Sequence, residues 1–507
     1  MTGAPSQPIL EARGIVKRFD GLVALDGVDF SLREGEVHAL VGENGAGKST
    51  LMSVLYGLQA PDRGTLLLRG APVRFARCVD AMNAGVGMVF QHFLLVERFT
   101  VAQNVLLGRE PVRGGFVDGA AEDAAVAELA ARYGFGLDPR AVVEELGVGA
   151  RQQVEVLKVL ERDAKIVILD EPTASLSPAE SQSLFDVVRR LRGEGRAIAL
   201  VSHKLREVLD IADRITVLRA GKVVGSVRAA DADISSLAEM MVGRDVDLDA
   251  RIPRATTIGK TVLSVRGARA KKDDGTPALH GVDVAVRGGE ILGVAGVEGN
   301  GQLEFAECVY GLRQVQDGCI VLADRDVTGD SATERRTLGM RYVPADRMRE
   351  GLVLEFDAPE NVLLGDQRRS NSVVLDLAGA RARAARSAQE YALTRFTPSA
   401  VAATYSGGMQ QKLIAGRELA AGAVAVIAYT PTRGVDIGAA EIIHARLRRI
   451  RDDGAAVVLV SYDLDEIRAL ADRIVVFAGG RVAGELTPDE ATDAVLGRLM
   501  GGAHAGA

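Results

Sequence analysis

The sequence contains the same long pattern twice. Residues 24–58 (ALDGVDFSLREGEVHALVGENGAGKSTLMSVLYGL) align without a gap with residues 278–312 (ALHGVDVAVRGGEILGVAGVEGNGQLEFAECVYGL). Farther along the chain, residues 212–225 (ADRITVLRAGKVVG) match residues 471–484 (ADRIVVFAGGRVAG). A repeat this long is a whole domain per copy and not a solenoid unit, which has a period of about 20–50 residues. The sequence therefore predicts one domain fold that is built twice.

The boundary between the two copies is expected in the segment DVDLDARIPRATTIGK, because this stretch is polar and unpatterned, as short linkers are. We predict a first domain at residues 1–245, a linker at 246–260 and a second domain at 261–507. Short apolar runs alternate with helical patterns in each copy, so the predicted class is α/β, with a mixed β-sheet core and a helical insertion per copy. In the first copy, residues 121–134 (AEDAAVAELAARYG) have the amphipathic spacing expected of that insertion.

The first copy carries a complete phosphate-binding loop at residues 42–50, which read GENGAGKST. Glycines let backbone N–H groups surround phosphate oxygens, while Lys48 is expected to reach the β- and γ-phosphates and the Ser49 hydroxyl to bind Mg²⁺. An apolar run fit for a buried strand precedes the loop (37–41) and a helical pattern follows it (51–57), as the mechanism requires. The predicted nucleotide contacts in this loop are Gly42, Asn44, Gly45, Gly47, Lys48, Ser49 and Thr50.

Two carboxylates follow a second apolar run in KIVILDEP, residues 165–172. We expect Asp170 to hold Mg²⁺, directly or through water, and Glu171 to polarise the water that attacks the γ-phosphate. An apolar run that ends in Asp-Glu is a weak signal alone. At this distance after a phosphate-binding loop it predicts a catalytic strand.

Three more candidates rest on their positions. His203 ends the apolar run AIALVSHK and suits a hydrogen bond to the γ-phosphate, although a lone histidine is more often an ordinary surface or core residue. Gln91 in VFQHF is a candidate for catalysis and for the metal. Phe19 in KRFDG is a candidate to stack on adenine, with ordinary core packing as the alternative.

Composition excludes several classes. The chain has 507 residues, 47% of them apolar, and a formal net charge of −7, which argues against a nucleic-acid-binding surface. No run of about 18 apolar residues occurs, so no membrane-spanning segment is expected. The N-terminus lacks the pattern of a secretion signal, and three scattered cysteines favour a reducing compartment. These features predict a cytoplasmic protein.

A further segment carries a resemblance. Residues 404–419 read TYSGGMQQKLIAGREL, and Ser406 is a good helix N-cap in front of glycines that expose backbone N–H groups, which makes an anion site. Together with the loop, the glutamine, the Asp-Glu strand and the histidine, in that order, the chain resembles an ATP-binding cassette (ABC) ATPase, twice over. Tyr405 and Met409 depart from the family's signature LSGGQ. In the first copy Gly147 and Val148 replace the signature's serine and one glycine.

The resemblance implies that ATP lies between the phosphate-binding loop of one domain and the signature of the other. Applied to this chain, it joins Gly42–Thr50, Glu171 and His203 of the first copy to the intact signature of the second. The signature residues expected to contact the nucleotide are Ser406, Gly407, Gly408 and Gln410. The implied cofactors are ATP and Mg²⁺.

The other site is eroded at every position. The substitutions are Gln302 for the lysine, Leu303 for the hydroxyl, Ala345 for Gln91, Tyr429 and Thr430 for the two carboxylates, and Tyr462 for His203. Losing one transition-state partner commonly costs about 10²–10³ in rate, so we expect no hydrolysis there. The second copy is expected either to be a structural half or to bind nucleotide through backbone groups without turnover.

Fused cassettes with a degenerate second half resemble the ATPase subunit of bacterial importers for sugars and nucleosides. The resemblance implies two membrane permease subunits, a solute-binding lipoprotein as an indirect partner, and a place on the inner face of the cell membrane, reached through the permeases alone. Residues 88–96 (MVFQHFLLV) and 342–356 (YVPADRMREGLVLEF) favour the nucleoside group, with a monosaccharide importer as the alternative. The apolar stretch 92–96 suits core packing and permease contact equally.

Three other classes of protein are less favoured: two kinds of soluble twin-cassette protein and a scaffold without activity. Ribosome-associated twin cassettes resemble two complete halves joined by a long basic linker, and repair proteins of this type carry zinc-binding cysteine clusters. A scaffold without activity would not need the complete set from Lys48 to His203. The sequence therefore predicts an ATPase.

Overall fold

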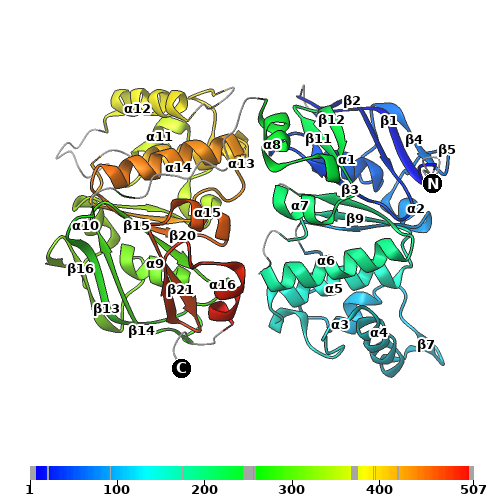
Figure 1. Ribbon diagram of the computed structural model, residues 1–507, viewed down its shortest axis with the longest axis horizontal. Helices are drawn as coiled ribbons and strands as arrows, with labels where there is room; N and C mark the ends of the chain where they lie inside the picture. The colour runs from blue at the N-terminus through cyan, green and yellow to red at the C-terminus, as the bar shows by residue number, and fades with distance from the viewer. Residues whose placement is uncertain are drawn as a thin grey trace. The chain divides into compact units, whose positions relative to one another are not determined.

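The structure is a computed structural model, and the chain divides in it into two compact units, Met1–Leu248 and Asp249–Ala507 (Figure 1). We call these the first unit and the second unit. The residues that the structure describes are 7–19, 22–91, 93–173, 176, 178–202, 204–243, 255, 258–366, 375–391, 393, 396–419, 422–435 and 437–501. Most of the predicted linker lies outside the described residues.

A six-stranded mixed sheet forms the centre of the first unit, in the order β12-β11-β3-β10-β9-β6. Its strands are β3 (Val37–Val41), β6 (Val86–Val89), β9 (Ile166–Asp170), β10 (Ala197–Val201), β11 (Arg214–Arg219) and β12 (Lys222–Arg228). Only the β11–β12 pair among these is antiparallel. Strands β3, β9 and β10 are buried at every residue because layers cover both faces, which is why they read as unbroken apolar runs.

A second, antiparallel sheet was not predicted from the sequence. Its order is β2-β1-β4-β5. Its strands are β1 (Leu10–Phe19), β2 (Leu22–Leu32), β4 (Arg63–Leu68) and β5 (Ala71–Val73), and a short hairpin is formed by β7 (Val112–Arg113) and β8 (Phe116–Val117). Leu25 of this sheet, Leu40 of the central sheet and Leu51 of α1 belong to one buried core cluster, so the helix after β3 is held between the two sheets.

The predicted helical insertion is present. The helices of the first unit are α1 (Lys48–Leu55), α2 (Cys78–Asn83), α3 (Val101–Val105), α4 (Gly119–Tyr133), α5 (Val148–Glu161), α6 (Pro178–Gly193), α7 (Leu205–Ile211) and α8 (Ile234–Val242). Helix α4 matches the amphipathic segment; Asp118 caps its start by accepting from the Ala121 amide, and Gly134 ends it in the left-handed conformation. Val126 of α4 and Val154 of α5 share a core cluster with the central sheet, which fixes the insertion to it.

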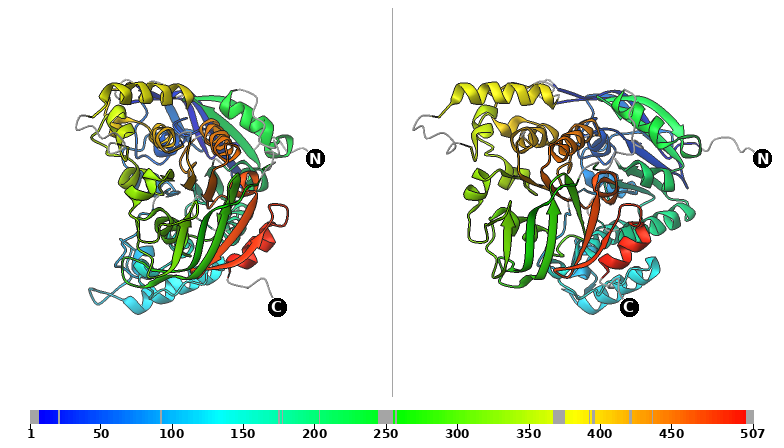
Figure 2. Two further views of the ribbon diagram at one scale, coloured as in Figure 1. Left: turned by 90° about the vertical axis from the view of Figure 1, so that its left-hand side faces the viewer. Right: turned by 60° about the vertical axis from the view of Figure 1, so that its left-hand side comes forward.

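The second unit repeats this plan (Figure 2). Its six-stranded sheet has the order β18-β19-β20-β15-β21-β22 and its antiparallel sheet the order β14-β13-β16-β17. The strands are β13 (Thr261–Lys271), β14 (Pro277–Arg287), β15 (Glu290–Ala295), β16 (Asp317–Leu322), β17 (Arg325–Asp326), β18 (Met340–Val343), β19 (Ala425–Tyr429), β20 (Ala456–Val460), β21 (Arg473–Ala478) and β22 (Arg481–Leu486). The helices are α9 (Gln302–Tyr310), α10 (Ala332–Thr337), α11 (Ala358–Leu363), α12 (Leu377–Glu390), α13 (Gly407–Glu418), α14 (Ile437–Asp452), α15 (Leu464–Leu470) and α16 (Asp493–Met500). Two α/β units of one plan confirm the predicted fold class.

Within the described part of the chain, no helix is both long and apolar enough to cross a membrane.

Candidate functional site

The loop between β3 and α1 has the conformation of a phosphate-binding site. Gly47 caps α1 with φ 105°, and a Cβ there would lie 2.5 Å from the Ala24 carbonyl oxygen, so only glycine fits. Gly45 also has positive φ, but a Cβ there would meet nothing within 4 Å. The loop is therefore closed toward the protein and open on the side where a phosphate would lie.

Lys48 is the first residue of α1, and its side chain folds back over the loop. Its ammonium donates to the carbonyl oxygens of Gly42 at 2.8 Å and Glu43 at 3.1 Å, and the residue is only 5% exposed. Burial lowers the pKa of Lys48, while the nearby Glu171 and Asp170 carboxylates oppose that shift. A buried ammonium inside this loop is suited to a strongly anionic ligand.

Asp170 ends β9 and faces Ser49 at the start of α1. The Ser49 hydroxyl donates to Oδ1 of Asp170 at 3.5 Å, and burial raises the pKa of Asp170, an effect that the serine bond opposes. Hydroxyl and carboxylate oxygens beside a phosphate loop are the ligands that Mg²⁺ prefers, since this ion keeps water and substrate phosphates as its remaining ligands. The residues of the first unit therefore fit magnesium.

Glu171 follows in a left-handed backbone conformation, with φ 48°. Such a conformation is uncommon outside glycine and costs on the order of 1 kcal/mol or more. Its amide donates to the Val201 carbonyl at 2.9 Å, and its Oε2 accepts from Nε2 of Gln91 at 3.1 Å. The structure thus brings Gln91 and Glu171 together, whereas His203 lies outside the described residues.

Phe19, the candidate for adenine stacking, is 39% exposed at the end of β1. The Lys17 ammonium lies 5.3 Å from the centroid of its ring. The alternative of ordinary core packing is therefore wrong for this residue, and contact with adenine stays a prediction.

The corresponding loop of the second unit keeps its backbone shape but has lost its charge. Gly301 caps α9 with φ 101°, close to Gly47. Gln302 lies where Lys48 lies in the first unit: it is 1% exposed and its Nε2 donates to the Val297 carbonyl at 3.1 Å. Its Oε1 is buried with no hydrogen-bond partner among the described residues. The loop is preserved as a turn without its cation.

Two tyrosines stand at the sequence positions of the metal-binding carboxylate Asp170 and of His203. The hydroxyls of Tyr429 and Tyr462 lie 2.6 Å apart, and burial raises the pKa of both, so both phenols are neutral. Thr430 keeps the left-handed conformation of Glu171, with φ 41°, but has no carboxylate. With Leu303 also lacking a ligand oxygen, this donor set does not fit Mg²⁺.

The Ser406 segment forms the start of α13, as predicted. Ser406 is the N-cap, and its hydroxyl accepts from the Met409 amide at 3.3 Å. Gln410 is buried and donates to the Ala402 carbonyl at 3.0 Å, so its amide nitrogen is engaged within the second unit. In the first unit Gly147 caps α5 without any side-chain bond.

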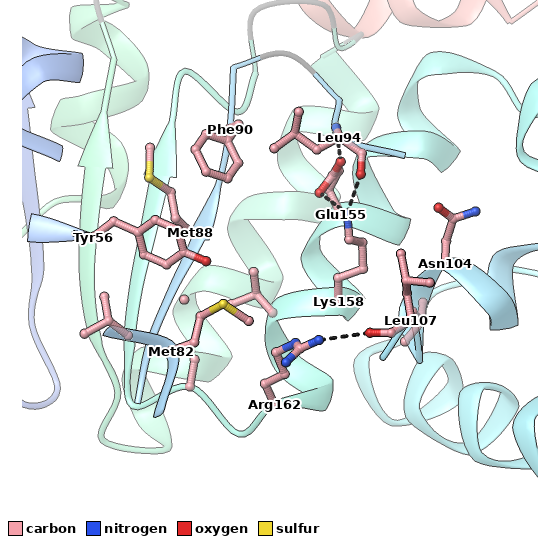
Figure 3. Close-up of a pocket in the computed structure, with 15 residues that line it drawn as sticks. Tyr56, Met82, Met88, Phe90, Leu94, Asn104, Leu107, Glu155, Lys158 and Arg162 are labelled. Carbon is pink, nitrogen blue, oxygen red and sulfur yellow. Dashed lines mark hydrogen bonds and ion pairs between the residues drawn. The ribbon is translucent and has the colours of Figure 1, made fainter. Parts of the chain in front are cut away.

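A cavity of about 210 Å³ lies beside the Gln91 loop in the first unit (Figure 3). Tyr56, Met88 and Phe90 give it an apolar wall, and Leu94, which is 58% exposed, lies at its edge. Lys158 of α5 donates to the Leu94 carbonyl at 2.7 Å, so a charged helix face supports the loop.

The apolar stretch 92–96 has no single environment: Leu95 packs against the core, whereas Leu94 borders the cavity. Core packing is therefore confirmed for Leu95, and permease contact by the stretch stays a prediction.

The second unit holds a buried ion pair in the corresponding place. Arg336 of α10 stands where Met82 stands in the first unit, and Glu418 of α13 stands where Val159 stands. Their charged groups meet at 2.6 Å, and Arg336 also pairs with Asp366 at 3.2 Å. The two units thus differ in chemistry at this position although they share a backbone plan.

The first unit therefore has the parts of a P-loop nucleotide hydrolase, and the second unit has the same fold with those parts replaced. The chain belongs to the ABC transporter family, whose profile matches residues 25–174 and 279–432. ATP-binding proteins of this family hydrolyse ATP to drive transport, and the chain is an ATPase of this kind.

Similar proteins span the whole chain. A ribose import ATP-binding protein of Rubrobacter xylanophilus is 43% identical over 99% of each chain. A nucleoside import ATP-binding protein of Lactococcus lactis subsp. cremoris is 40% identical over 98% of this chain and 99% of that protein. Among solved structures, an RNase-L inhibitor matches 97% of this chain and 93% of its own with a TM-score of 0.66, at 16% identity. That likeness concerns the fold alone.

Proposed function

We propose that this chain is the ATP-hydrolysing subunit of an importer and that it has one hydrolytic site. The observation that carries the proposal is the contrast between the units. The first unit brings together Lys48, Ser49, Asp170, Glu171 and Gln91. The second unit has Gln302, Leu303, Tyr429, Thr430 and Ala345 in their places, and none of these residues is charged.

In the proposed reaction, Glu171 polarises the water that attacks the γ-phosphate, and Gln91 orients the carboxylate through the hydrogen bond between them. Lys48 lies beside the β- and γ-phosphates and offsets their charge, and His203 donates to the γ-phosphate. Mg²⁺, held by Ser49 and Asp170, would neutralise charge on the phosphates. Water adds to phosphorus, the bond to the bridging oxygen breaks, and ADP and inorganic phosphate result.

The start of α13 completes this site in the proposal. Ser406, Gly407 and Gly408 are placed over the terminal phosphate, because a capped helix start with glycines offers N–H groups to an anion. Gln410 contacts the nucleotide there only if its bond to Ala402 opens. ATP then bridges the two units, and loss of the γ-phosphate weakens the bridge, so that the nucleotide biases their equilibrium between two arrangements.

We place the subunit on the inner face of the membrane, held by two permease subunits, with a solute-binding lipoprotein as an indirect partner. Gln91, which contacts Glu171, is proposed to report the presence of the γ-phosphate to the permease. The cavity beside Gln91 suits a permease contact, since it combines an apolar wall with an exposed leucine (Figure 3). No nucleic acid is expected as a partner, given the net charge of −7.

Nucleosides are the proposed cargo, and ribose or a similar sugar is the alternative. Both find support, because relatives at 40–43% identity are named for nucleoside import and for ribose import. Nucleoside and sugar binding to the importer's solute receptor decides between them.

The substitution Glu171→Gln tests the hydrolytic role. It keeps the shape of the side chain but removes the carboxylate, so ATP turnover by the full chain should fall at least about 100-fold. The matched control is Thr430→Val, at the same position and in the same left-handed conformation in the second unit, and it should leave turnover within about twofold. Substantial turnover by the Glu171 variant would rule out the single-site assignment.

A further inference from the structure

One arginine of the second unit lies over the start of α13 and has no role in the site described so far. Arg347 begins a single π-helical turn, Arg347–Gly351, two residues after Ala345. Asp346 fixes the turn, because its Oδ1 accepts from the amides of Met348 at 2.9 Å and Arg349 at 3.1 Å. Turns of this kind are frequent at functional sites.

The guanidinium of Arg347 lies close to two glycines, Gly407 and Gly434. A Cβ on Gly407 would lie 2.6 Å from Nη2, and a Cβ on Gly434 would lie 2.8 Å from Nη1, so a side chain at either position would displace the guanidinium from its present place. Nη1 also makes a long hydrogen bond, 3.4 Å, to the Arg433 carbonyl. The side chain therefore joins the start of α13 to the loop after β19.

One edge of the same guanidinium lacks a partner. Nε is buried and makes no hydrogen bond to any described residue. A buried donor without an acceptor is unfavourable, so an incoming acceptor there would be favoured. Nε and Nη2 share one edge of the guanidinium, which is the edge that binds two oxygens of a phosphate or carboxylate at once. Because Nη2 is the nitrogen nearest Gly407, this edge lies at the proposed nucleotide cap.

The first unit has the opposite charge at the equivalent helix start. A Cβ on Gly149 of α5 would lie 1.9 Å from Oε1 of Glu180, so a carboxylate covers that glycine. Phe93 stands in the sequence position of Arg347. An anion is thus favoured by side chains at the start of α13 and disfavoured at the start of α5.

We propose that Arg347, acting together with Ser406 and Gly407 of the same unit, binds the terminal phosphate of ATP. This inference rests on the proposed function and deepens it, because it assigns to the second unit a cation that the sequence motif does not contain. ADP has no γ-phosphate to offer this arginine, so Arg347 distinguishes ATP from ADP.

The experiment measures equilibrium binding of ADP and of an ATP analogue with an uncleavable β–γ bridge to the full chain, with Mg²⁺. Arg347→Ala should weaken analogue binding about 10- to 100-fold, the scale of one hydrogen bond to a charged group, and leave ADP binding within about twofold. Arg347→Lys should recover part of the loss, because it restores the charge but not the paired donors. Arg349→Ala removes an exposed charge from the same turn and should change neither affinity.

The variant Ser406→Ala distinguishes a failure of the proposed role of Arg347 from a failure of the proposed nucleotide cap. If this variant weakens analogue binding while Arg347→Ala does not, the role of Arg347 is overturned and the proposed cap stands. If neither variant changes the ratio of the two affinities, the cap itself fails. An equal loss of ADP and analogue binding in Arg347→Ala, with none recovered by lysine, would make Arg347 a support of the fold and also overturn the inference.

Discussion

His38 lies in the middle of β3, the strand that leads into the phosphate-binding loop, and is 1% exposed. One ring nitrogen is 2.7 Å from the Ser31 carbonyl oxygen and the other is 2.7 Å from the Thr216 hydroxyl. Burial, together with the nearby Arg214 guanidinium, lowers the pKa of His38 to about 3. The folded protein therefore favours the neutral imidazole well below the pKa of a free histidine.

This residue predicts a pH-dependent stability of the first unit. The pKa of an unfolded histidine is about 6.5, so the stabilising effect of the neutral imidazole is complete above that pH and is lost progressively as the pH falls toward 3. Each pH unit in this window lowers the free energy of unfolding by up to about 1.4 kcal/mol. Urea unfolding of the first unit between pH 7 and pH 4.5 measures the slope.

The control for that slope is His38→Leu, which installs the residue that the second unit has at this place, Leu292. The Ser31 carbonyl keeps a bond from Arg214 and the Thr216 hydroxyl keeps its bond to Ser226, so no buried polar group is left without a partner. The variant should unfold with a shallower pH dependence. An unchanged slope would show that other groups set the acid sensitivity.

At the level of elements, α10 and α13 are joined by the buried pair of Arg336 and Glu418. Glu418→Gln should lower the free energy of unfolding of the second unit by about 3 kcal/mol, since it leaves a buried guanidinium without its main partner. The double variant Arg336→Met with Glu418→Val, which carries the pair found in the first unit, should recover at least half of that loss. Denaturant unfolding followed in the second unit measures both.

A double variant that is as unstable as Glu418→Gln alone would contradict this reading of the pair. In that case Asp366 and Arg417, which also contact the pair, would carry the stability of the contact between α10 and α13.

The sequence was sufficient for elements whose signal is local. The strands at β3, β9 and β10, the helix α4 and the cap at Ser406 all follow from periodicity and capping within a few residues. The loss of charge in the second loop also follows directly from Gln302 and Leu303.

The sequence was not sufficient where partners are distant in the chain. The antiparallel sheet, the cavity near Leu94 and the pair of Arg336 and Glu418 depend on tertiary packing, for which no local pattern exists. Arg347 was missed for the same reason: its meaning lies in the glycines beneath it, Gly407 and Gly434, and neither is near it in sequence. The sequence also leaves core packing and adenine stacking open for Phe19, and only its exposure in the folded unit argues against core packing.

At the scale of the whole molecule, both units keep the same fold, but the groups that a nucleotide site needs are distributed between them. The first unit retains the cation, the carboxylates and the glutamine, while the second retains the capped helix start and adds Arg347 beside it. In the first unit, the helix start of α5 has lost its serine and is covered by Glu180. Each unit is thus deficient where the other is complete, which is the pattern expected of a chain with one productive site.

Trapping of nucleotide by vanadate tests this claim most directly. With Mg²⁺ and ATP, the full chain should retain one ADP per polypeptide, because a hydrolysed γ-phosphate that vanadate can replace is formed at one site only. Lys48→Ala and Ser406→Ala should each abolish trapping, although they lie in different units, whereas Gln302→Ala should leave one ADP per chain. Two trapped nucleotides per chain, or one that survives Lys48→Ala, would contradict the account.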